Sequence, residues 1–384
     1  MHIVFITGNY PTLCHPTSGT FVQQFVWAIA RQGIDCTVIN PTSLFDRRYG
    51  PYPLRYSIED AGGGKKINLY RPYYISFSSK NLGWAHTGRW TQCALNFISR
   101  RAVGALVSKP DVLYGHFLYN AGRAAVFAGI KHGIPSVIGV GEGTFWTVDP
   151  FGFDQAKRDF RTAAGFIAVG QHIQTGLSDE ISIPLSKIIV EPNGVDRTLF
   201  FKADQCEARL QLGLEQGLFI IAFVGTFDDL KGGQELLSAV DGMSGMSLAM
   251  IGRGEKSFDS PNIIFKGTVN HSQITTWLNA ADIFVLPTRE EGSCNAVIEA
   301  MACGLPIVTS NGRYMDDIVD DEVAIRVDPI DVLAIREAIL LLKNDPDRRK
   351  RMSIACLKKA KKFDINERAR RVTAWMEELV KKKS

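Results

Sequence analysis

Short apolar runs alternate with longer amphipathic stretches along the first half of the chain. Residues 21–33, FVQQFVWAIARQG, show the helical period and end at a glycine. Strands and helices that alternate at this spacing are typical of βαβ units on a parallel sheet. The first half therefore predicts an open α/β domain. Its expected strands are HIVFIT (2–7), CTVIN (36–40), DVLYGH (111–116), PSVIGV (135–140), GFIAVG (165–170) and KIIVEP (187–192).

A second series of apolar runs begins at residue 218. These runs are nearly continuous in apolar residues, as expected for strands covered by helices on both faces. They predict a second α/β domain. The runs are LFIIAFVG (218–225), SLAMIG (247–252), NIIFKG (262–267), IFVLP (283–287) and PIVTS (306–310). Residues 48–92 are rich in aromatics and glycines and predict no clear element.

The two series are separated by residues 191–204, EPNGVDRTLFFKAD. This stretch has a proline, an Asn-Gly turn and mixed polarity, as a linker does. A chain of 384 residues is also too long for one ordinary core and suits two domains of about 150 to 200 residues. We therefore predict an α/β protein with two domains, the first at residues 1–192 and the second beginning at residue 193.

Composition narrows the class of protein. Hydrophobic residues make up 45% of the chain and charged residues 22%, as in soluble globular proteins. The seven cysteines are scattered and form no CxxC pair, which favours a reducing compartment over a disulfide or zinc framework. The N-terminus lacks a signal-peptide pattern, and no segment reaches the ~20 apolar residues of a membrane span. We expect a cytoplasmic protein.

The charge is unevenly distributed. The net charge is +4, but residues 343–384 hold 15 Lys and Arg against 6 Asp and Glu, a net charge of +9. This stretch predicts basic helices, whose exposed charge can meet an anionic membrane, nucleic acid or only solvent. Residues 94–109, apolar with basic edges, could rest on an anionic membrane or face the core. We expect no nucleic-acid partner and at most peripheral contact with the inner face of the cell membrane.

The loop VGTFDDLKGG is the first candidate for chemistry. It places Gly225 after a strand and Lys231 just before a helix. Small residues let backbone N–H groups approach an anion, and the helix N-terminus and the lysine attract negative charge. The loop thus predicts a diphosphate site, although it matches neither GxGxxG nor GxxxxGK[ST]. The alternative is an ordinary turn with an exposed lysine.

Two glutamates mark a second candidate loop. Glu291 follows a strand, and Glu299 lies in the otherwise apolar helix AVIEAMA. Side chains on a helix lean toward its N-terminus, so both carboxylates can face one ligand. Carboxylate oxygens suit the adjacent hydroxyls of a ribose or a hexose, and the N–H groups that open the helix suit a sugar or phosphate oxygen. A solvated pair of glutamates is the alternative, which we reject because a Glu in an apolar helix needs a partner.

The string EGSCNAVIEAMACGLPIV, with Glu291 and Glu299 spaced as E-x7-E, closely resembles the donor-binding motif of the family 4 retaining glycosyltransferases. The resemblance covers nearly the whole chain. It includes SGTF near the N-terminus, NGVD, GTFDDLKGG and IGRGE, in the family's order. It implies the GT-B fold, in which two Rossmann-like domains face each other across a deep cleft. A C-terminal helix at about 365–384 would return to the first, acceptor-binding domain, and residues 193–364 would bind the donor.

The resemblance also implies roles for individual residues. Lys231 would neutralise the diphosphate leaving group, and His116 would lie near the donor sugar. Glu299 would hold the ribose hydroxyls of the donor, while Glu291 would contact the transferred sugar. The other implied donor contacts are Gly19, Gly225 and the backbone of Ser293, Cys294 and Asn295.

One position departs from the family. The family often has an arginine soon after the glycine that corresponds to Gly225, and this chain has Thr226 there. Half of the usual cationic pair is thus missing, and Arg253 in IGRGE is our candidate substitute. No carboxylate pair has the DxD context of metal-dependent transfer, because Asp345-Pro346-Asp347 is better explained as capping of a helix. We therefore expect neither a catalytic metal nor a cofactor.

The sequence says less about the residues that bind the acceptor. Glu142, between two glycines at a strand end, could orient or deprotonate an acceptor hydroxyl, or could be a solvated loop residue. Asn9, after the first strand, is a second candidate acceptor contact, and the aromatic region 49–90 would shape that site. By resemblance, the acceptor is a saccharide or a lipid-linked saccharide.

The favoured function is transfer of a hexose, with retention, from a UDP- or GDP-sugar to a hydroxyl acceptor in cell-surface polysaccharide or glycolipid synthesis. Two alternatives stay open. A nucleotide-sugar epimerase can use the same fold, and Thr226 keeps open a catalytically silent nucleotide-sugar-binding protein.

Overall fold

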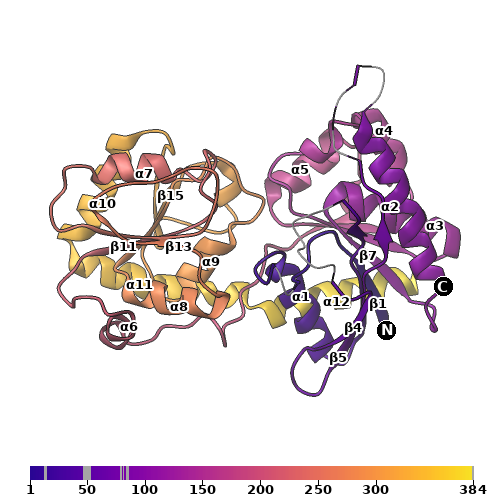
Figure 1. The fold of residues 1–384 in the computed structure, drawn as a ribbon, viewed down its shortest axis with the longest axis horizontal. Helices are drawn as coiled ribbons and strands as arrows, with labels where there is room; N and C mark the ends of the chain where they lie inside the picture. The colour runs from indigo at the N-terminus through magenta and orange to yellow at the C-terminus, as the bar shows by residue number, and fades with distance from the viewer. Residues whose placement is uncertain (13–14, 46–52, 78–79, 81, 84–85, 383–384) are drawn as a thin grey trace. The chain divides into compact units, whose positions relative to one another are not determined.

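The computed structural model describes residues 1–12, 15–45, 53–77, 80, 82–83 and 86–382. The chain divides into two compact units (Figure 1). Unit 1 contains Met1–Pro192 and Ile365–Ser384, and unit 2 contains Asn193–Asp364. Both units are α/β and built on largely parallel sheets, so the fold class expected from the two series of apolar runs is confirmed.

Unit 1 is built on a sheet whose described strands run in the order β10-β9-β8-β7-β1-β2-β5-β4. Neighbouring strands are parallel except β4 and β5, which are antiparallel. The apolar runs form the central strands because both faces there are covered by buried side chains. The strands are β1 (His2–Ile6), β2 (Asp35–Ile39), β4 (Tyr56–Asp60), β5 (Lys66–Tyr70), β7 (Val112–His116), β8 (Ser136–Val140), β9 (Gly165–Ala168) and β10 (Ile188–Val190). A separate pair joins β3 (Thr42–Ser43) to β6 (Tyr73–Tyr74).

Residues 48–92, for which the sequence predicts no clear element, contain the β4–β5 hairpin. Its turn has three consecutive glycines with positive φ, Gly62 to Gly64, a conformation that other residues adopt at a cost. Every second residue of β4 is exposed, which leaves a weak apolar signal. Part of the expected acceptor region 49–90, including Tyr49, lies outside the described residues.

The helices of unit 1 follow the strands in alternation. They are α1 (Thr20–Arg31), α2 (Thr87–Gly104), η2 (Phe117–Gly122), α3 (Arg123–His132), η3 (Trp146–Val148), α4 (Phe153–Phe160), α5 (Gln171–Asp179) and η4 (Leu185–Lys187). The stretch 94–109, considered for membrane contact, lies largely on α2, where Leu95 and Val103 are buried and Phe97 is exposed. The alternative that this helix faces the core is therefore correct for one of its sides.

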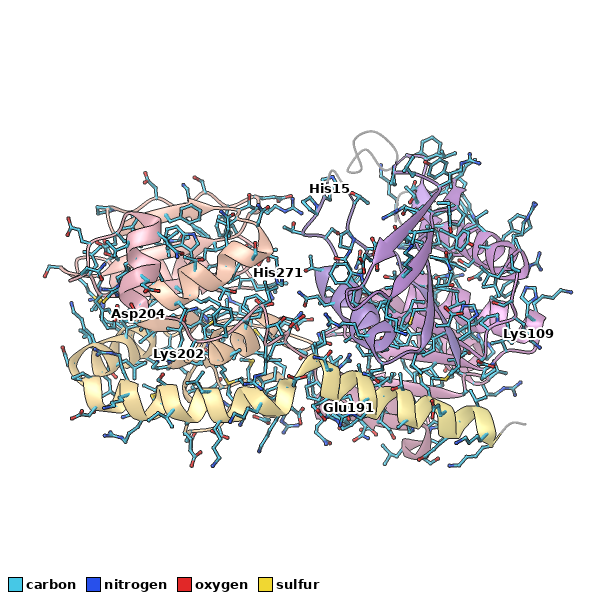
Figure 2. The ribbon with its side chains drawn as sticks, turned by 90° about the horizontal axis from the view of Figure 1, so that it is seen from below. His15, Lys109, Glu191, Lys202, Asp204 and His271 are labelled. Atoms are coloured by element: carbon cyan, nitrogen blue, oxygen red, sulfur yellow. The ribbon has the colours of Figure 1, made fainter. Side chains whose placement is uncertain are left out.

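The last helix, α12 (Ile365–Lys381), belongs to unit 1 although it follows unit 2 in the chain. Ile365, Ala369, Val372 and Met376 share one face and are buried in the core beside α1. The opposite edge is held by charge, because Arg371 donates two hydrogen bonds of 2.8 Å to the Glu191 carboxylate, which lies next to α12 (Figure 2).

Unit 2 has a sheet whose described strands are all parallel, in the order β13-β12-β11-β14-β15-β16. The strands are β11 (Ile220–Val224), β12 (Ser247–Ile251), β13 (Ile263–Gly267), β14 (Ile283–Leu286), β15 (Ile307–Ser310) and β16 (Ala324–Val327). Its helices are α6 (Gln205–Leu212), α7 (Gly233–Val240), α8 (His271–Ala280), α9 (Asn295–Ala302), η5 (Arg313–Met315), α10 (Val332–Asn344), α11 (Pro346–Ala360) and η6 (Lys361–Phe363). One apolar core fills the space between sheet and helices.

The basic C-terminal stretch forms α11 and α12. Asp345 caps α11, since its side chain accepts a hydrogen bond of 2.8 Å from the backbone N–H of Arg348. The capping explanation of Asp345-Pro346-Asp347 is confirmed. Within the described residues, no helix combines the length and the apolar character that crossing a membrane requires.

Candidate functional site

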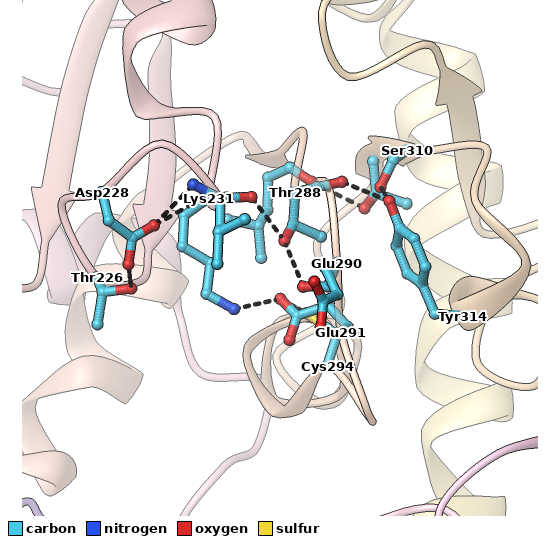
Figure 3. Close-up of polar contacts among 12 residues, drawn as sticks. Thr226, Asp228, Lys231, Thr288, Glu290, Glu291, Cys294, Ser310 and Tyr314 are labelled. Atoms are coloured by element: carbon cyan, nitrogen blue, oxygen red, sulfur yellow. Dashed lines mark hydrogen bonds and ion pairs between the residues drawn. The ribbon is translucent and has the colours of Figure 1, made fainter. Parts of the chain in front are cut away.

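Two loops of unit 2 follow neighbouring parallel strands. Residues 225–232 come after β11, and residues 287–294 come after β14. The carboxyl ends of parallel strands share one edge of a sheet, so the two loops lie together. Lys231 Nζ lies 2.6 Å from Glu291 Oε1 (Figure 3). The expected diphosphate cation and the expected sugar-binding carboxylate therefore form an ion pair.

This ion pair is largely withdrawn from solvent. The side chains of Lys231 and Glu291 are 22% and 11% exposed, so the alternative of an exposed loop lysine is wrong. Burial is the largest single influence on the pKa of Lys231 and lowers it, but the charge of Glu291, its hydrogen bond to Lys231 and the further effects of Cys294 and Asp228 together outweigh burial, and the pKa is raised above its ordinary value. Lys231 therefore stays charged.

Cys294 adds a second contact to Glu291. Its thiol lies 3.5 Å from the same carboxylate oxygen that Lys231 contacts. Burial, and then the charge of Glu291, raise the pKa of this thiol well above its ordinary range. Cys294 is therefore a protonated donor to Glu291, not a thiolate.

The conformation of the first loop aims Lys231 at the second. Asp228 accepts hydrogen bonds from the backbone N–H groups of Leu230 (2.9 Å) and Lys231 (3.1 Å), and its other oxygen accepts from the Thr226 hydroxyl. Gly232 follows with φ +70°, and a Cβ there would lie 2.2 Å from the carbonyl oxygen of Pro287. Only glycine allows this close approach of the two loops.

Gly225 is held by the strand beside it. The N–H of Gly225 donates to the carbonyl of Ile251 (3.0 Å). A Cβ at Gly252 would lie 1.8 Å from the carbonyl oxygen of Gly225. The carbonyl of Arg253 accepts from Phe227 N–H (2.9 Å), while the Arg253 side chain is exposed and has no ion-pair partner within the described residues. Its role as the missing cation stays a prediction.

Glu299 has the partner that its apolar helix requires. His271 Nε2 lies 3.2 Å from Glu299 Oε1, and the two side chains are 22% and 13% exposed. His271 is the first residue of α8, and its ring packs edge to face on Phe200 at 5.0 Å. The sequence analysis missed His271, whose position just after β13 was the available signal.

The start of α9 is tied to the start of unit 2. The backbone N–H of Asn193 donates to Ser293 Oγ (3.1 Å), and its side-chain amide donates to Asn295 Oδ1 (3.0 Å). Cys294, the N-cap, makes no side-chain capping bond. The side chains of Ser293 and Asn295 thus support the loop, while the first N–H groups of the helix can serve a ligand.

Two candidate residues of unit 1, Gly19 and Asn9, pack against each other between β1 and α1. Gly19 caps α1 with φ +71°, and a Cβ there would lie 2.5 Å from the carbonyl oxygen of Asn9. Asn9 is exposed, and its N–H donates to Thr7 Oγ1 (3.1 Å). The close packing of Gly19 on Asn9 already explains the glycine, so its phosphate contact stays a prediction.

His116 ends β7 and is buried, with 8% of its surface exposed. Burial, followed by the positive charge of Arg368, lowers its pKa to about 3, so the imidazole is neutral. Nδ1 lies 3.2 Å from the Tyr114 hydroxyl, whereas Nε2 has no hydrogen-bond partner among the described residues. A neutral histidine with one unsatisfied nitrogen can still bind a hydroxyl.

Glu142 is 5% exposed, so the alternative of a solvated loop residue is wrong. Its carboxylate accepts from the backbone N–H groups of Leu118 (2.7 Å) and Gly141 (3.1 Å) and from the Thr147 hydroxyl (3.3 Å). Burial raises its pKa to about 7 despite these bonds. The carboxylate holds the loop that follows His116, and a contact to the acceptor stays a prediction.

Among the residues that the structure describes, no group of three or more His, Cys, Asp or Glu side chains is placed to hold a metal ion. The independence of catalysis from metal stays a prediction.

Two family models match the chain. The model for glycosyltransferase family 4 matches residues 18–199, and the model for glycosyl transferases group 1 matches residues 219–345. The teichuronic acid biosynthesis glycosyltransferase named TuaC, of Bacillus subtilis, is 27% identical over 354 residues, which cover 88% of each protein. The D-inositol 3-phosphate glycosyltransferase of Arthrobacter sp. is 29% identical over 195 residues, which cover 46% of each.

Solved structures show the same fold at low identity. A sucrose-phosphate synthase from Thermosynechococcus elongatus superposes with a TM-score of 0.77 at 16% identity, covering 98% of both chains. HepE from Anabaena, in complex with UDP and glucose, superposes with a TM-score of 0.71 at 15% identity, covering 98% of this chain and 100% of the other. One family match covers most of unit 1 and runs a few residues into unit 2, and the other covers most of unit 2, so the chain belongs to the family 4 glycosyltransferases with the GT-B fold.

Proposed function

We propose that the protein is a retaining glycosyltransferase that moves a hexose from a nucleotide diphosphate sugar to a hydroxyl acceptor without a metal ion. Unit 2 binds the donor, and unit 1 binds the acceptor. The proposal goes beyond family membership in three respects, namely the retained configuration, the independence from metal and the roles of individual residues.

The Lys231–Glu291 ion pair is the observation that carries the proposal. It holds a charged lysine, 22% exposed, where two strands end beside the N-terminus of α9. A departing diphosphate gains negative charge, and a cation that is already oriented stabilises this charge without reorganisation. Lys231 and the first N–H groups of α9 are therefore our candidates for stabilising the leaving group.

In this proposal Glu299 and Glu291 bind different parts of the donor. Glu299, oriented by His271 at 3.2 Å, accepts hydrogen bonds from the ribose hydroxyls. Glu291, oriented by Lys231, contacts the transferred hexose. Gly19, Gly225 and Arg253 complete the donor contacts that the family resemblance implies.

His116 contacts the donor sugar through its unsatisfied Nε2. Its lowered pKa, about 3, keeps it neutral at physiological pH, so it acts by hydrogen bonding and not as a charged acid. A front-face reaction assisted by the leaving phosphate, which is the proposal usual for the family, then accounts for retention without a protein nucleophile.

The relatives support the class of donor and acceptor. Structures of HepE are described in complex with UDP and with UDP-glucose, and one relative from Corynebacterium glutamicum is a GDP-mannose-dependent mannosyltransferase. TuaC is assigned to teichuronic acid biosynthesis. We infer a UDP- or GDP-sugar donor and a saccharide or lipid-linked saccharide acceptor, used in the cytoplasm for cell-surface polysaccharide or glycolipid synthesis.

A thermal-shift panel tests the donor site. UDP, GDP, ADP and CMP are added with and without EDTA to the wild type, to Glu299→Ala and to Glu337→Ala, a control at an exposed position on α10. A ligand at a hundred times its Kd stabilises the fold by ~2.7 kcal/mol. We expect one diphosphate to stabilise the wild type and the control, with or without EDTA, but not Glu299→Ala. No shift with any nucleotide would contradict the proposal.

Product analysis tests the reaction. NMR of the anomeric proton in product and donor should show the same configuration, and excess EDTA should leave turnover unchanged. Inversion would disprove retention, and activity that is lost in EDTA and restored by manganese would disprove metal independence. A free epimer formed without an acceptor would identify an epimerase instead.

A further inference from the structure

A small cavity lies in unit 1 at the carboxyl edge of its sheet, where ligands of open α/β sheets bind. Its volume is about 200 Å³. The loops after β1 and β2 form one wall, and α2, η2 and the start of α3 form the other. Its polar lining residues are Asn9, Ser43, Tyr74, Thr91, Ser99 and Asn120.

One wall of the cavity is a face of α2. Thr91, Leu95 and Ser99 are spaced four residues apart, so they line up on the same side of the helix. The Thr91 hydroxyl is engaged with the backbone of Phe77. Ser99 is fully buried, and its Oγ has no hydrogen-bond partner among the described residues. A buried hydroxyl without a partner is rare and is explained if a ligand supplies the partner.

The part of the same wall that η2 forms carries backbone strain. Asn120 has φ 61° and ψ −93°, a conformation that non-glycine residues seldom adopt. It is held there by Gln92, which accepts from the Asn120 N–H (2.6 Å) and donates to its carbonyl oxygen (2.9 Å). Gln92 is buried and also donates to Asn96 Oδ1 (2.8 Å). Strain that a buried side chain enforces through two hydrogen bonds at a cavity indicates a functional position.

The lining chemistry selects the ligand. Hydroxyl and amide groups line the cavity, and no charged side chain does so within the described residues. Phosphate and carboxylate groups are bound preferentially by Arg and Lys, whereas sugar hydroxyls can also pair with neutral donors and acceptors and need no cation. The volume is below the ~300 to 1,000 Å³ of pockets for drug-sized ligands, so it suits a single ring.

We propose that this cavity binds one uncharged sugar ring of the acceptor. Ser99 Oγ bonds a ring hydroxyl, and Gln92 is a positioning residue that fixes Asn120 at the cavity wall. The inference rests on the proposed function, because it names the chemistry of the acceptor end that enters unit 1.

The test compares neutral with charged probes on the wild-type protein. Saturation-transfer NMR would measure binding of methyl α-D-glucopyranoside, methyl α-D-mannopyranoside and methyl N-acetyl-β-D-glucosaminide, with glucose 6-phosphate and glucuronic acid as charged counterparts. At least one neutral glycoside should bind, and it should bind more tightly than either charged sugar. Equal or tighter binding of a charged sugar, or no binding of any neutral glycoside, would overturn the inference.

Variants place the bound ring in the cavity. Ser99→Ala should weaken the neutral glycoside about 3- to 10-fold, the effect of one lost hydrogen bond. Ser99→Val, which also fills space, should abolish binding, and Cys93→Ala, on an exposed face of the same helix, should change nothing. Unchanged binding in Ser99→Ala would overturn the inference, and this result can be obtained even if Ser99→Val fails to fold, because Ser99→Ala removes only one oxygen.

The role of Gln92 has its own readout. In a transfer assay with the bound glycoside as acceptor, Gln92→Leu should raise the KM for the acceptor and leave the KM for the donor unchanged. A change in both, or in neither, would show that Gln92 does not position an acceptor group. Stabilisation by a nucleotide diphosphate is measured in parallel. If it persists while neutral glycosides fail, only the acceptor inference is lost; if it is absent, the proposed function itself fails.

Discussion

Two paired contacts in unit 2 contrast with two unpaired polar atoms in unit 1. In unit 2, Lys231 pairs with Glu291 at 2.6 Å, and His271 contacts Glu299 at 3.2 Å. In unit 1, His116 Nε2 and Ser99 Oγ are buried and lack a hydrogen-bond partner within the described residues. Groups that are paired inside one unit keep their geometry without a ligand, whereas an unpaired buried polar atom lowers stability until something binds it.

This difference indicates two modes of preparation for a ligand. Unit 2 arranges its charges in advance, so a substitution there removes stabilisation that the reaction uses. Unit 1 leaves polar atoms unsatisfied, so a substitution there can leave stability unchanged or raise it while binding is lost. The comparison predicts different readouts for substitutions in the two units.

The largest effect is expected for Lys231→Ala. Loss of the oriented cation beside the leaving group should lower kcat about 100- to 1,000-fold, as loss of one preorganised electrostatic contact does in other enzymes. The control is Lys256→Ala, because Lys256 pairs with Asp229 at a more exposed position nearby, where an ion pair contributes little. Steady-state kinetics with the donor sugar would measure both. A loss below about threefold for Lys231→Ala would show that Lys231 does not stabilise the leaving group.

A second prediction uses the pH dependence of unfolding. In the folded chain the pKa of His116 is about 3, and in the unfolded chain it returns to about 6.5. The unfolded chain then binds a proton that the folded chain excludes, so this contribution is complete above pH 6.5 and is lost as the pH falls toward 3. Between pH 7 and pH 5 the wild type should lose about 2 kcal/mol more than His116→Gln.

Urea unfolding at the two pH values would measure this difference, with His132→Gln as the control. His132 contacts the backbone carbonyl of Arg100 at 3.1 Å and tests for a general effect of removing a histidine. If wild type and His116→Gln lose the same stability on acidification, His116 is not held neutral by burial, and the contrast between the units would then depend on Ser99 alone.

The smallest effect is expected for His271→Ala. This change removes one oriented contact to Glu299 but leaves the carboxylate, so the Kd of the nucleotide should rise only about three- to fivefold. Ser272→Ala, at an exposed position one residue later on α8, is the control. Isothermal titration with the nucleotide found by thermal shift would measure both. An unchanged Kd for His271→Ala would mean that Glu299 needs no internal partner to bind.

The parallel sheets were readable from the sequence because their strands are buried on both faces. β11, β12 and β14 are nearly continuous apolar runs, and helical periods separate them. The β4–β5 hairpin could not be predicted from the sequence. Every second residue of β4 is exposed, and the turn of the hairpin consists of glycines, which are equally common in loops. Local pattern therefore identifies the centre of a sheet better than its edge.

The candidate site divides in the same way. Glu299 in an apolar helix predicted a partner, but nothing local identified His271, because that contact depends on how α8 and α9 pack. The position of Glu142 in a loop left open the alternative of a solvated residue, although tertiary packing buries it. The cavity beside Ser99 was not predicted because it is assembled from segments spread from β1 to α3, each ordinary on its own.

The place of α12 has a consequence for the order in which the protein is made. Residues 1–192 leave the ribosome first, but the helix that completes the core of unit 1 follows only after Asn193–Asp364. At a synthesis rate of about 5 to 20 residues per second, that intervening segment takes about 10 to 35 s. During this interval the surface that will receive Ala369, Val372 and Met376 lacks its cover, while unit 2 can already close. The half that is translated first is thus the last to be completed.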